Sequence, residues 1–220
     1  MLKKKVYFRT LLFSILFFIF LFLPAGSLNF WEAWIYFVIF LGSTLFINGY
    51  FLKRDPELIE RRTNANEKEK EQKVFQTISG ISFVGLLVLP GLDYRFSWSN
   101  VPLFIVLVAD IIILLGFSIV FLVFKENSYT SAIIEVNENQ KVISTGPYAL
   151  VRHPMYTGAI FIILFTPLAL GSIWAVIPSI SIIIFIILRL LNEEKVLLKE
   201  LKGYEEYCKK TRYHLIPLIW

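Results

Sequence analysis

The chain has 220 residues, of which 56% are hydrophobic, and it carries a formal net charge of +5. A soluble domain of this length cannot enclose so much apolar surface in one core, so the composition excludes an ordinary soluble fold and indicates lipid as the solvent. The single cysteine, Cys208, excludes an intrachain disulfide. Basic residues lie at the ends of apolar runs, which favours a role in membrane orientation over nucleic-acid binding.

Apolar runs that are long enough to cross a bilayer follow one another along the chain, because a span needs roughly 20 residues. Four spans are predicted, at residues 7–23, 31–52, 74–89 and 101–124. A last apolar stretch at 157–191 is too long for one span, and it is interrupted by Pro167, Gly171 and Pro178. It predicts two short helices that form a hairpin with a turn near Gly171, which brings the total to six spans.

Charged segments lie between and after these runs. Residues 53–73 open with Asp55-Pro56-Glu57, which supplies an N-cap, a proline at the first helical position and an acid in the first turn. A short amphipathic helix through Arg62 is therefore predicted. The alternating charges at residues 67–71 are typical of a solvated surface. From Asn192 onward the chain is a charged, helix-forming tail that predicts a cytoplasmic C-terminal helix.

The distribution of Lys and Arg supports six spans. An even number of spans places both termini on one side, and 21 of the 22 basic residues then lie on that side, with only Arg95 on the other. The positive-inside rule predicts that both termini are cytoplasmic. The chain is interpreted as one all-α, polytopic membrane domain, with an N-terminal four-span region at residues 1–124 and a C-terminal region at residues 125–220.

Residues whose side chains can bind a ligand or take part in catalysis gather at the entry to the fifth span, in the run GPYALVRHPMYTG at 146–158. The run combines rigid prolines with a guanidinium, an imidazole and two phenol rings, from Arg152, His153, Tyr148 and Tyr156. These groups suit a flat, polar, partly charged ligand. The alternative is an anchor of Arg, Tyr and His at headgroup level. The density of rigid residues beside functional groups favours a binding site.

A second group lies at the predicted cytoplasmic end of the sixth span. Arg189 and Glu193 are four residues apart and share a helix face, whereas Glu194 is displaced by about 100°. In one interpretation Arg189 and Glu193 form an ordinary ion pair and Glu194 is solvated. In the other, Glu194 faces a cationic or hydroxylated ligand, and Arg189 faces an anionic group of the substrate.

Asp110 lies deep in the fourth span, where an unpaired carboxylate is costly. We expect it to face the bundle and to hydrogen-bond to a neighbouring helix. Proton or ion movement is the alternative, but the sequence offers no second buried acid or base for a relay. The sequence also contains no glycine-rich nucleotide motif and no metal-ligand spacing, and its two histidines, His153 and His214, exclude a histidine-rich metal centre.

The ordered set of motifs resembles the isoprenylcysteine carboxyl methyltransferase and phospholipid methyltransferase superfamily. The resemblance covers residues 125–220. It is carried by the run at 146–158, by Arg189 with Glu193-Glu194, and by Tyr204-x-x-Tyr207 with residues 212–217. The first four spans resemble the family only in being apolar. The resemblance implies a membrane methyltransferase core that uses S-adenosylmethionine without a Rossmann domain.

The resemblance also implies which residues hold the ligands. The cofactor pocket would be lined by the backbone around Val142 and Ile143, and by Tyr148, His153, Tyr156 and Glu194. Arg189 would hold or orient the methyl acceptor. Tyrosine faces and a carboxylate suit a sulfonium cofactor. The implied acceptor is an amphiphilic or lipid-embedded carboxylate, thiol or amine. We expect no metal, no nucleic acid and no obligate protein partner.

Two other classes of function stay open at this point. A membrane reductase of the sterol-reductase type shares the C-terminal layout but uses NADPH, and it needs more basic groups for the 2′-phosphate. A non-enzymatic lipid-binding or transport protein predicts an inverted repeat or several buried ionisable groups. The composition, rich in Ile, Phe, Lys and Asn, suggests a bacterial protein of the cell membrane.

Overall fold

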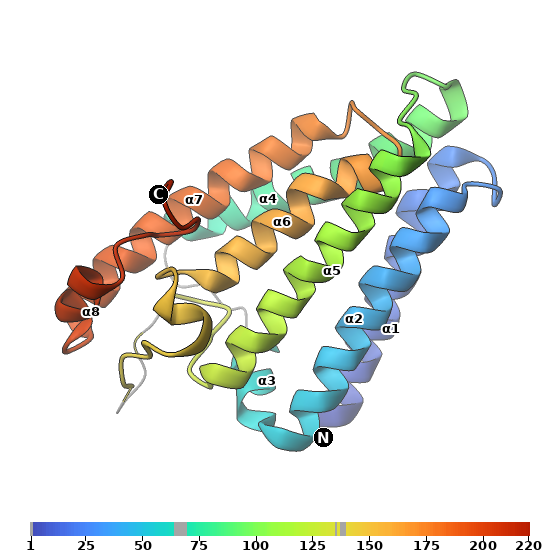
Figure 1. Ribbon diagram of the computed structural model, residues 1–220. Helices are drawn as coiled ribbons and strands as arrows, with labels where there is room; N and C mark the ends of the chain where they lie inside the picture. Colours follow the sequence, from blue (N-terminus) through green and yellow to red (C-terminus); the bar gives the residue numbers. More distant parts are fainter. Residues whose placement is uncertain (1, 64–69, 135, 137–139) are drawn as a thin grey trace.

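The computed structural model describes residues 2–63, 70–134, 136 and 140–220, and these residues form helices and loops without strands. The long helices lie side by side in a bundle (Figure 1). Its elements in chain order are α1 (Leu2–Ala25), α2 (Trp31–Arg54), α3 (Pro56–Thr63), α4 (Lys70–Phe96), α5 (Leu103–Glu126), the 3-10 turn η1 (Gly146–Ala149), α6 (Pro154–Ala169), α7 (Val176–Glu200) and α8 (Tyr204–Lys210).

Five of the helices are long and apolar enough to cross a membrane: α1, α2, the part of α4 at Thr77–Phe96, α5 and α7. α6 is a shorter apolar helix. Large apolar side chains are exposed along the outer surface of the bundle, as lipid-facing helices require. The prediction of an all-α, polytopic membrane protein is therefore confirmed. α7 continues to Glu200, past the predicted end of the apolar run, because the residues that follow are good helix formers.

The predicted hairpin between the last two spans is also confirmed. α6 ends at Ala169, and Gly171 adopts a left-handed conformation with φ of +67°. A glycine reaches this conformation without steric cost, so the chain can reverse there. The Gly171 amide donates to the Leu168 carbonyl at 3.1 Å, and the Ser172 amide donates to the Pro167 carbonyl at 2.8 Å. These bonds satisfy carbonyls at the end of α6.

α5 and α6 approach each other closely (Figure 1). Gly116 and Gly158 face one another across the contact, and a Cβ atom on either would lie 2.8 Å from the carbonyl oxygen of the other. Small residues at such a crossing let two membrane helices pack backbone to backbone. The contact fixes α6, whose first turn carries part of the candidate site.

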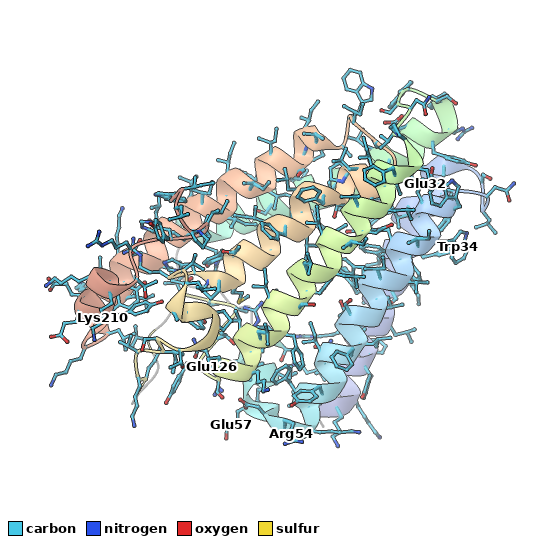
Figure 2. The ribbon with its side chains drawn as sticks, viewed as in Figure 1. Glu32, Trp34, Arg54, Glu57, Glu126 and Lys210 are labelled. Atoms are coloured by element: carbon cyan, nitrogen blue, oxygen red, sulfur yellow. The ribbon has the colours of Figure 1, made fainter. Side chains whose placement is uncertain are left out.

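Charged groups mark one end of the bundle. Figure 2 shows Arg54, Glu57, Glu126 and Lys210 toward that end, whereas Glu32 and Trp34 lie at the other. α3 lies at the charged end, and its predicted start is confirmed, since the Asp55 carboxylate accepts a hydrogen bond from the Leu58 amide at 3.0 Å. The side chains of the charge run predicted at residues 67–71 lie outside the described part of the structure.

Asp110 is buried in α5, with 4% of its surface exposed, and it faces the bundle as expected. The expected hydrogen bond to a neighbouring helix is wrong, however. Among the described residues, neither oxygen of its carboxylate has a hydrogen-bond partner. The hydrogen bond between helices in this part of the bundle is instead formed by the hydroxyls of Tyr36 on α2 and Thr166 on α6, which lie 2.8 Å apart.

Candidate functional site

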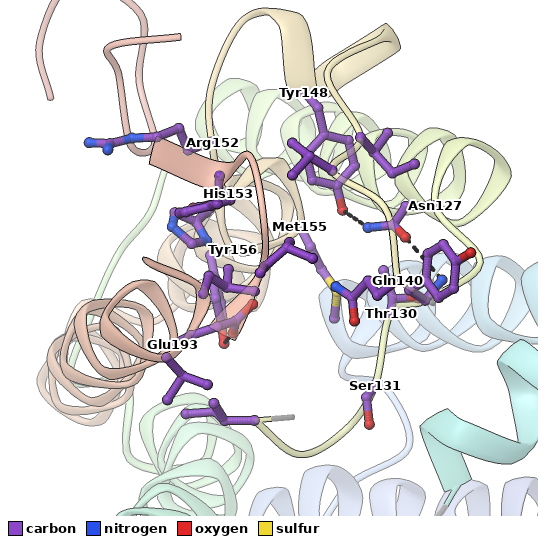
Figure 3. Close-up of a pocket in the computed structure, with 18 of the residues that line it drawn as sticks. Asn127, Thr130, Ser131, Gln140, Tyr148, Arg152, His153, Met155, Tyr156 and Glu193 are labelled. Carbon is purple, nitrogen blue, oxygen red and sulfur yellow. Dashed lines mark hydrogen bonds between the residues drawn. The ribbon is translucent and has the colours of Figure 1, made fainter. Parts of the chain in front are cut away.

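A pocket of about 290 Å³ opens at the charged end of the bundle (Figure 3). Its walls come from α3, from the segment between α5 and η1, from η1 with the first turn of α6, and from the far end of α7 with α8. Six of the seven residues assigned to the site from the sequence line this one pocket: Val142, Ile143, Tyr148, His153, Tyr156 and Arg189. The fold therefore brings together groups that lie up to 47 positions apart in the sequence.

The η1 turn places Tyr148 in the pocket. Gly146 takes a left-handed φ of +57°, and a Cβ atom there would lie 3.1 Å from the Glu126 side chain, so glycine suits this position. The Thr145 hydroxyl donates to Glu126, which ties the turn to the end of α5. Asn127 then donates a hydrogen bond of 2.9 Å to the Tyr148 hydroxyl (Figure 3). Burial raises the pKa of Tyr148 to about 12, so the phenol stays protonated.

His153 is held immediately before α6, because Pro154 occupies the first helical position. Its side chain is 5% exposed, and its Nε2 atom has no hydrogen-bond partner among the described residues. Burial lowers the pKa of His153 to about 3, and the neighbouring His214 and Arg152 act in the same direction. The ring is therefore neutral at physiological pH, and it presents an uncharged nitrogen to the pocket.

Three further residues of the pocket wall, Tyr204, Thr130 and Arg152, carry a buried polar atom without a partner among the described residues. The hydroxyls of Tyr204 on α8 and of Thr130 are both buried, and neither has a partner within the described part of the chain. Buried polar atoms are nearly always paired, and an unpaired one costs about 1–3 kcal/mol. Four such atoms on a single pocket, His153 Nε2 and Arg152 Nε among them, indicate that the pocket binds a polar ligand.

A carboxylate also lines the pocket. The Tyr156 hydroxyl donates a hydrogen bond of 2.5 Å to Glu193, and both residues line the pocket (Figure 3). One helical turn earlier on α7, Arg189 donates to the Ala132 carbonyl at 2.8 Å. Glu193 is thus a pocket residue that sequence reasoning placed only in a possible ion pair with Arg189.

Glu194 lies on a different side of α7. It is 7% exposed, it is not part of the pocket wall, and its carboxylate pairs with Arg152 at 2.5 Å and with His214 at 2.7 Å. It is therefore not the solvated residue that one interpretation expected. A direct contact between Glu194 and a cofactor stays a prediction, and its observed partners favour an indirect role behind His153.

The Glu194 cluster fastens the C-terminal tail to the entry of α6. The Arg152 amide donates to the Tyr213 carbonyl at 2.8 Å, and the His153 amide donates to the His214 carbonyl at 3.0 Å. His214 also stacks on Trp220, with ring centroids 4.7 Å apart. The tail thereby holds the backbone of Arg152 and His153 immediately before α6.

The cluster formed by Leu201, Tyr204 and Tyr207 closes the α8 side of the pocket, and Val142 packs against it. The Tyr207 hydroxyl donates to the Tyr148 carbonyl at 2.7 Å, which ties α8 to η1. Burial raises the pKa values of Tyr204 and Tyr207 above their ordinary range. Both tyrosines therefore present neutral phenols.

Sequence reasoning did not assign several other polar residues of the pocket wall, among them Arg62, Asn127, Thr130 and Glu193. Arg62 comes from α3, and its guanidinium donates to the Ser131 carbonyl at 2.7 Å. The predicted amphipathic helix ended at Arg62, but nothing in the local pattern indicated that the side chain turns toward a site formed by the C-terminal half.

The fold and the pocket define a polytopic membrane protein with a buried polar site at one end of its bundle. Residues 104–203 match the family model described as phospholipid methyltransferase. The match confirms the resemblance to the isoprenylcysteine and phospholipid methyltransferase superfamily, which is a family of membrane methyltransferases. It begins inside α5 and includes most of the pocket wall, but it does not include α3. No curated protein matches the chain.

Proposed function

We propose that the protein transfers a methyl group from S-adenosylmethionine to an amphiphilic or lipid-embedded acceptor at the cytoplasmic face of the cell membrane. The observation that carries this proposal is the pocket whose buried polar atoms on His153, Tyr204, Thr130 and Arg152 have no partner among the described residues, in a chain that matches a methyltransferase family. The family match supports the reaction class. The pocket supports the binding of a small polar cofactor.

The residues of the pocket fit such a cofactor. Tyr148, Tyr156 and Tyr207 supply electron-rich rings, and Glu193 supplies a carboxylate, which together suit a positively charged sulfonium. His153 and Tyr204 offer hydrogen-bonding atoms for its polar groups. The volume of about 290 Å³ lies at the lower end of the range for small-molecule sites, about 300–1,000 Å³.

When it is bound, S-adenosylmethionine supplies an electrophilic methyl group for an in-line displacement. The protein contributes positioning, which supplies about 7–11 kcal/mol in well-oriented reactions. His153 orients by hydrogen bonding without adding charge, because its ring is neutral. The buried pair of Arg152 with Glu194 keeps the peptide before His153 in place. Arg189, on α7, orients the acceptor.

A carboxylate acceptor needs no proton acceptor, whereas a thiol or an amine does. His153, with its lowered pKa, is a weak base, and Glu194 is already paired with Arg152 and His214. Glu193 is the carboxylate that lines the pocket among the described residues. It is therefore the group that would accept a proton from such an acceptor.

The placement at the cytoplasmic face of a bacterial cell membrane is part of the same proposal. It is supported by the basic residues, since six spans leave only Arg95 on the far side. The pocket lies at the end of the bundle to which α3 and the end of α5 contribute. Both termini would then be cytoplasmic, and a soluble cofactor would reach the pocket from the cytoplasm.

The test is methyl transfer into lipid. The purified protein is reconstituted with a bacterial lipid extract and supplied with S-adenosylmethionine that carries a radiolabelled methyl group. We expect label in the lipid fraction with the unmodified protein and with Arg95→Gln, a control at the opposite end of the bundle. His153→Ala should abolish most of this transfer. Labelling that is equal in His153→Ala and the control would contradict the assigned pocket.

A further inference from the structure

Two guanidinium groups converge on neighbouring atoms of the pocket wall. Arg62 on α3 donates to the carbonyl of Ser131 at 2.7 Å, and Arg189 on α7 donates to the carbonyl of the next residue, Ala132, at 2.8 Å. Both arginines line the pocket. Helices from the two halves of the chain thus place their cations side by side on one short segment.

The charge of Arg62 has no direct ion-pair partner in the part of the chain that the structure describes. No carboxylate among the described residues forms a salt bridge with Arg62, whereas its neighbour Arg61 pairs with Glu57 at 3.5 Å. Burial lowers the pKa of Arg62, and the nearby charge of Arg189 acts in the same direction, while Glu193 opposes it. An arginine stays charged even so. Arg62 and Arg189 thus place two cations beside the one carboxylate of Glu193, and this excess of positive charge in a buried wall attracts an anion.

The orientation of Arg62 leaves donors for a ligand. Its guanidinium lies over the ring of Phe124, with its central carbon 5.4 Å from the ring centroid, a cation–π contact that supports its position. A guanidinium carries five N–H donors, and within the described residues Arg62 makes one hydrogen bond, to Ser131. A second guanidinium, that of Arg189, lies beside it, and a pair of guanidiniums matches the several oxygen atoms of a phosphate or a carboxylate.

We propose that Arg62 and Arg189 form an oxyanion-binding subsite that recognises the phosphate or carboxylate of an amphiphilic ligand. Figure 3 shows Ser131, on which Arg62 rests, across the pocket from His153. The Ser131 end of the subsite therefore lies apart from the His153 ring. The identification of this ligand as the methyl acceptor rests on the proposed function, whereas the binding of the oxyanion does not. Arg62 adds a specificity-determining residue from outside the family-matched segment.

The test measures binding of dioctanoyl phosphatidic acid to the purified protein in a neutral detergent, by calorimetry. Arg62→Gln should weaken this affinity by about tenfold to a hundredfold, the usual loss for a hydrogen bond to a charged group. Arg61→Gln is the matched control, because Arg61 also donates to the same segment, at the Ser128 carbonyl, but does not line the pocket. Arg61→Gln should change the affinity for phosphatidic acid by less than about threefold, as expected for a surface substitution outside the pocket. Dioctanoyl phosphatidylcholine, whose headgroup is neutral overall, should bind more weakly than phosphatidic acid to the unmodified protein.

Inorganic phosphate distinguishes the source of the oxyanion. Competition by inorganic phosphate with the unmodified protein, lost in Arg62→Gln, would show that the free anion suffices. Binding of the lipid alone would show that the apolar chains are also required. Equal losses in Arg61→Gln and Arg62→Gln, or no loss in Arg62→Gln, would overturn the subsite.

Binding of S-adenosylmethionine is measured in the same samples, and Arg62→Gln should retain it, which also shows that the variant is folded. If S-adenosylmethionine fails to bind the unmodified protein while phosphatidic acid binds in an Arg62-dependent way, the proposed function fails and the subsite stands. If the cofactor binds and the lipid affinity does not depend on Arg62, the subsite fails alone.

Discussion

The hydroxyl of Tyr156 donates a hydrogen bond of 2.5 Å to the carboxylate of Glu193, and this contact joins the first turn of α6 to the far part of α7. The two helices form the hairpin that closes at Gly171, so their other ends are held together by this bond inside the pocket. The shape of the pocket therefore depends on a polar contact between two residues that also face the ligand.

Tyr156→Phe should reduce both stability and cofactor affinity. The substitution keeps the ring but removes the hydroxyl, and Glu193 then loses its 2.5 Å partner. Loss of such a partner costs about 1–3 kcal/mol. Thermal unfolding and calorimetric binding of S-adenosylmethionine measure the two effects. Tyr94→Phe, at the opposite end of the bundle, is the control and should leave the affinity unchanged. Unchanged affinity in Tyr156→Phe as well would show that the contact is not part of the site.

Glu193→Gln and Glu194→Gln should fail in different ways. Glu194 holds Arg152 and His214 in a buried cluster, and breaking a buried ion pair costs about 3–5 kcal/mol, so Glu194→Gln should mainly lower the unfolding temperature. Glu193 lines the pocket, so Glu193→Gln should mainly reduce methyl transfer. Unfolding curves and lipid labelling separate the two variants. A larger loss of stability in Glu193→Gln than in Glu194→Gln would contradict these assignments.

Acid should destabilise the protein partly through His153. Its pKa falls from an ordinary 6.5 to about 3 in the folded protein, so below 6.5 the unfolded chain binds a proton that the folded chain does not. The stability that the neutral ring contributes is present above 6.5 and is lost as the pH falls from 6.5 toward about 3. The unfolding temperature of His153→Asn should therefore depend less on pH across this window than that of the unmodified protein. Parallel pH profiles of the two proteins would show that His153 is not held neutral by burial.

Gly116→Ala should separate α5 from α6. The added Cβ would lie 2.8 Å from the carbonyl oxygen of Gly158, and overpacking of this kind costs about 1–3 kcal/mol. The control is Gly42→Ala on α2, where a Cβ atom meets nothing within 4 Å, and it should be neutral or slightly stabilising. Thermal unfolding in detergent compares the two. Equal unfolding temperatures would show that the close contact of the helices does not depend on these glycines.

The membrane fold followed from the sequence because the length of a span is set by the bilayer. The apolar runs and the turn near Gly171 are local features, and the structure confirms the turn and five helices that are long enough to span, with α6 shorter than the predicted sixth span. The division of the chain at residue 124 stays a prediction. The missing partner of Asp110 was not foreseen, because the expected hydrogen bond depends on which helix packs opposite it.

The candidate site was predictable where it is continuous in sequence. Tyr148, His153 and Tyr156 lie within one short run, so their approach to one pocket required only that the run enter a helix. The choice between Glu193 and Glu194 was not predictable, because a rotation of about 100° about the α7 axis decides which of them faces the pocket. The sequence also could not predict that Arg62 lines the pocket, because its position depends on how α3 packs against the C-terminal half.

Calorimetric binding of S-adenosylmethionine, its demethylated product and NADPH to the detergent-purified protein tests the central claim most directly. The account predicts that the sulfonium cofactor and its product bind, that NADPH does not, and that His153→Ala weakens both affinities. Selective binding of NADPH, or binding of S-adenosylmethionine that His153→Ala leaves unchanged, would contradict it.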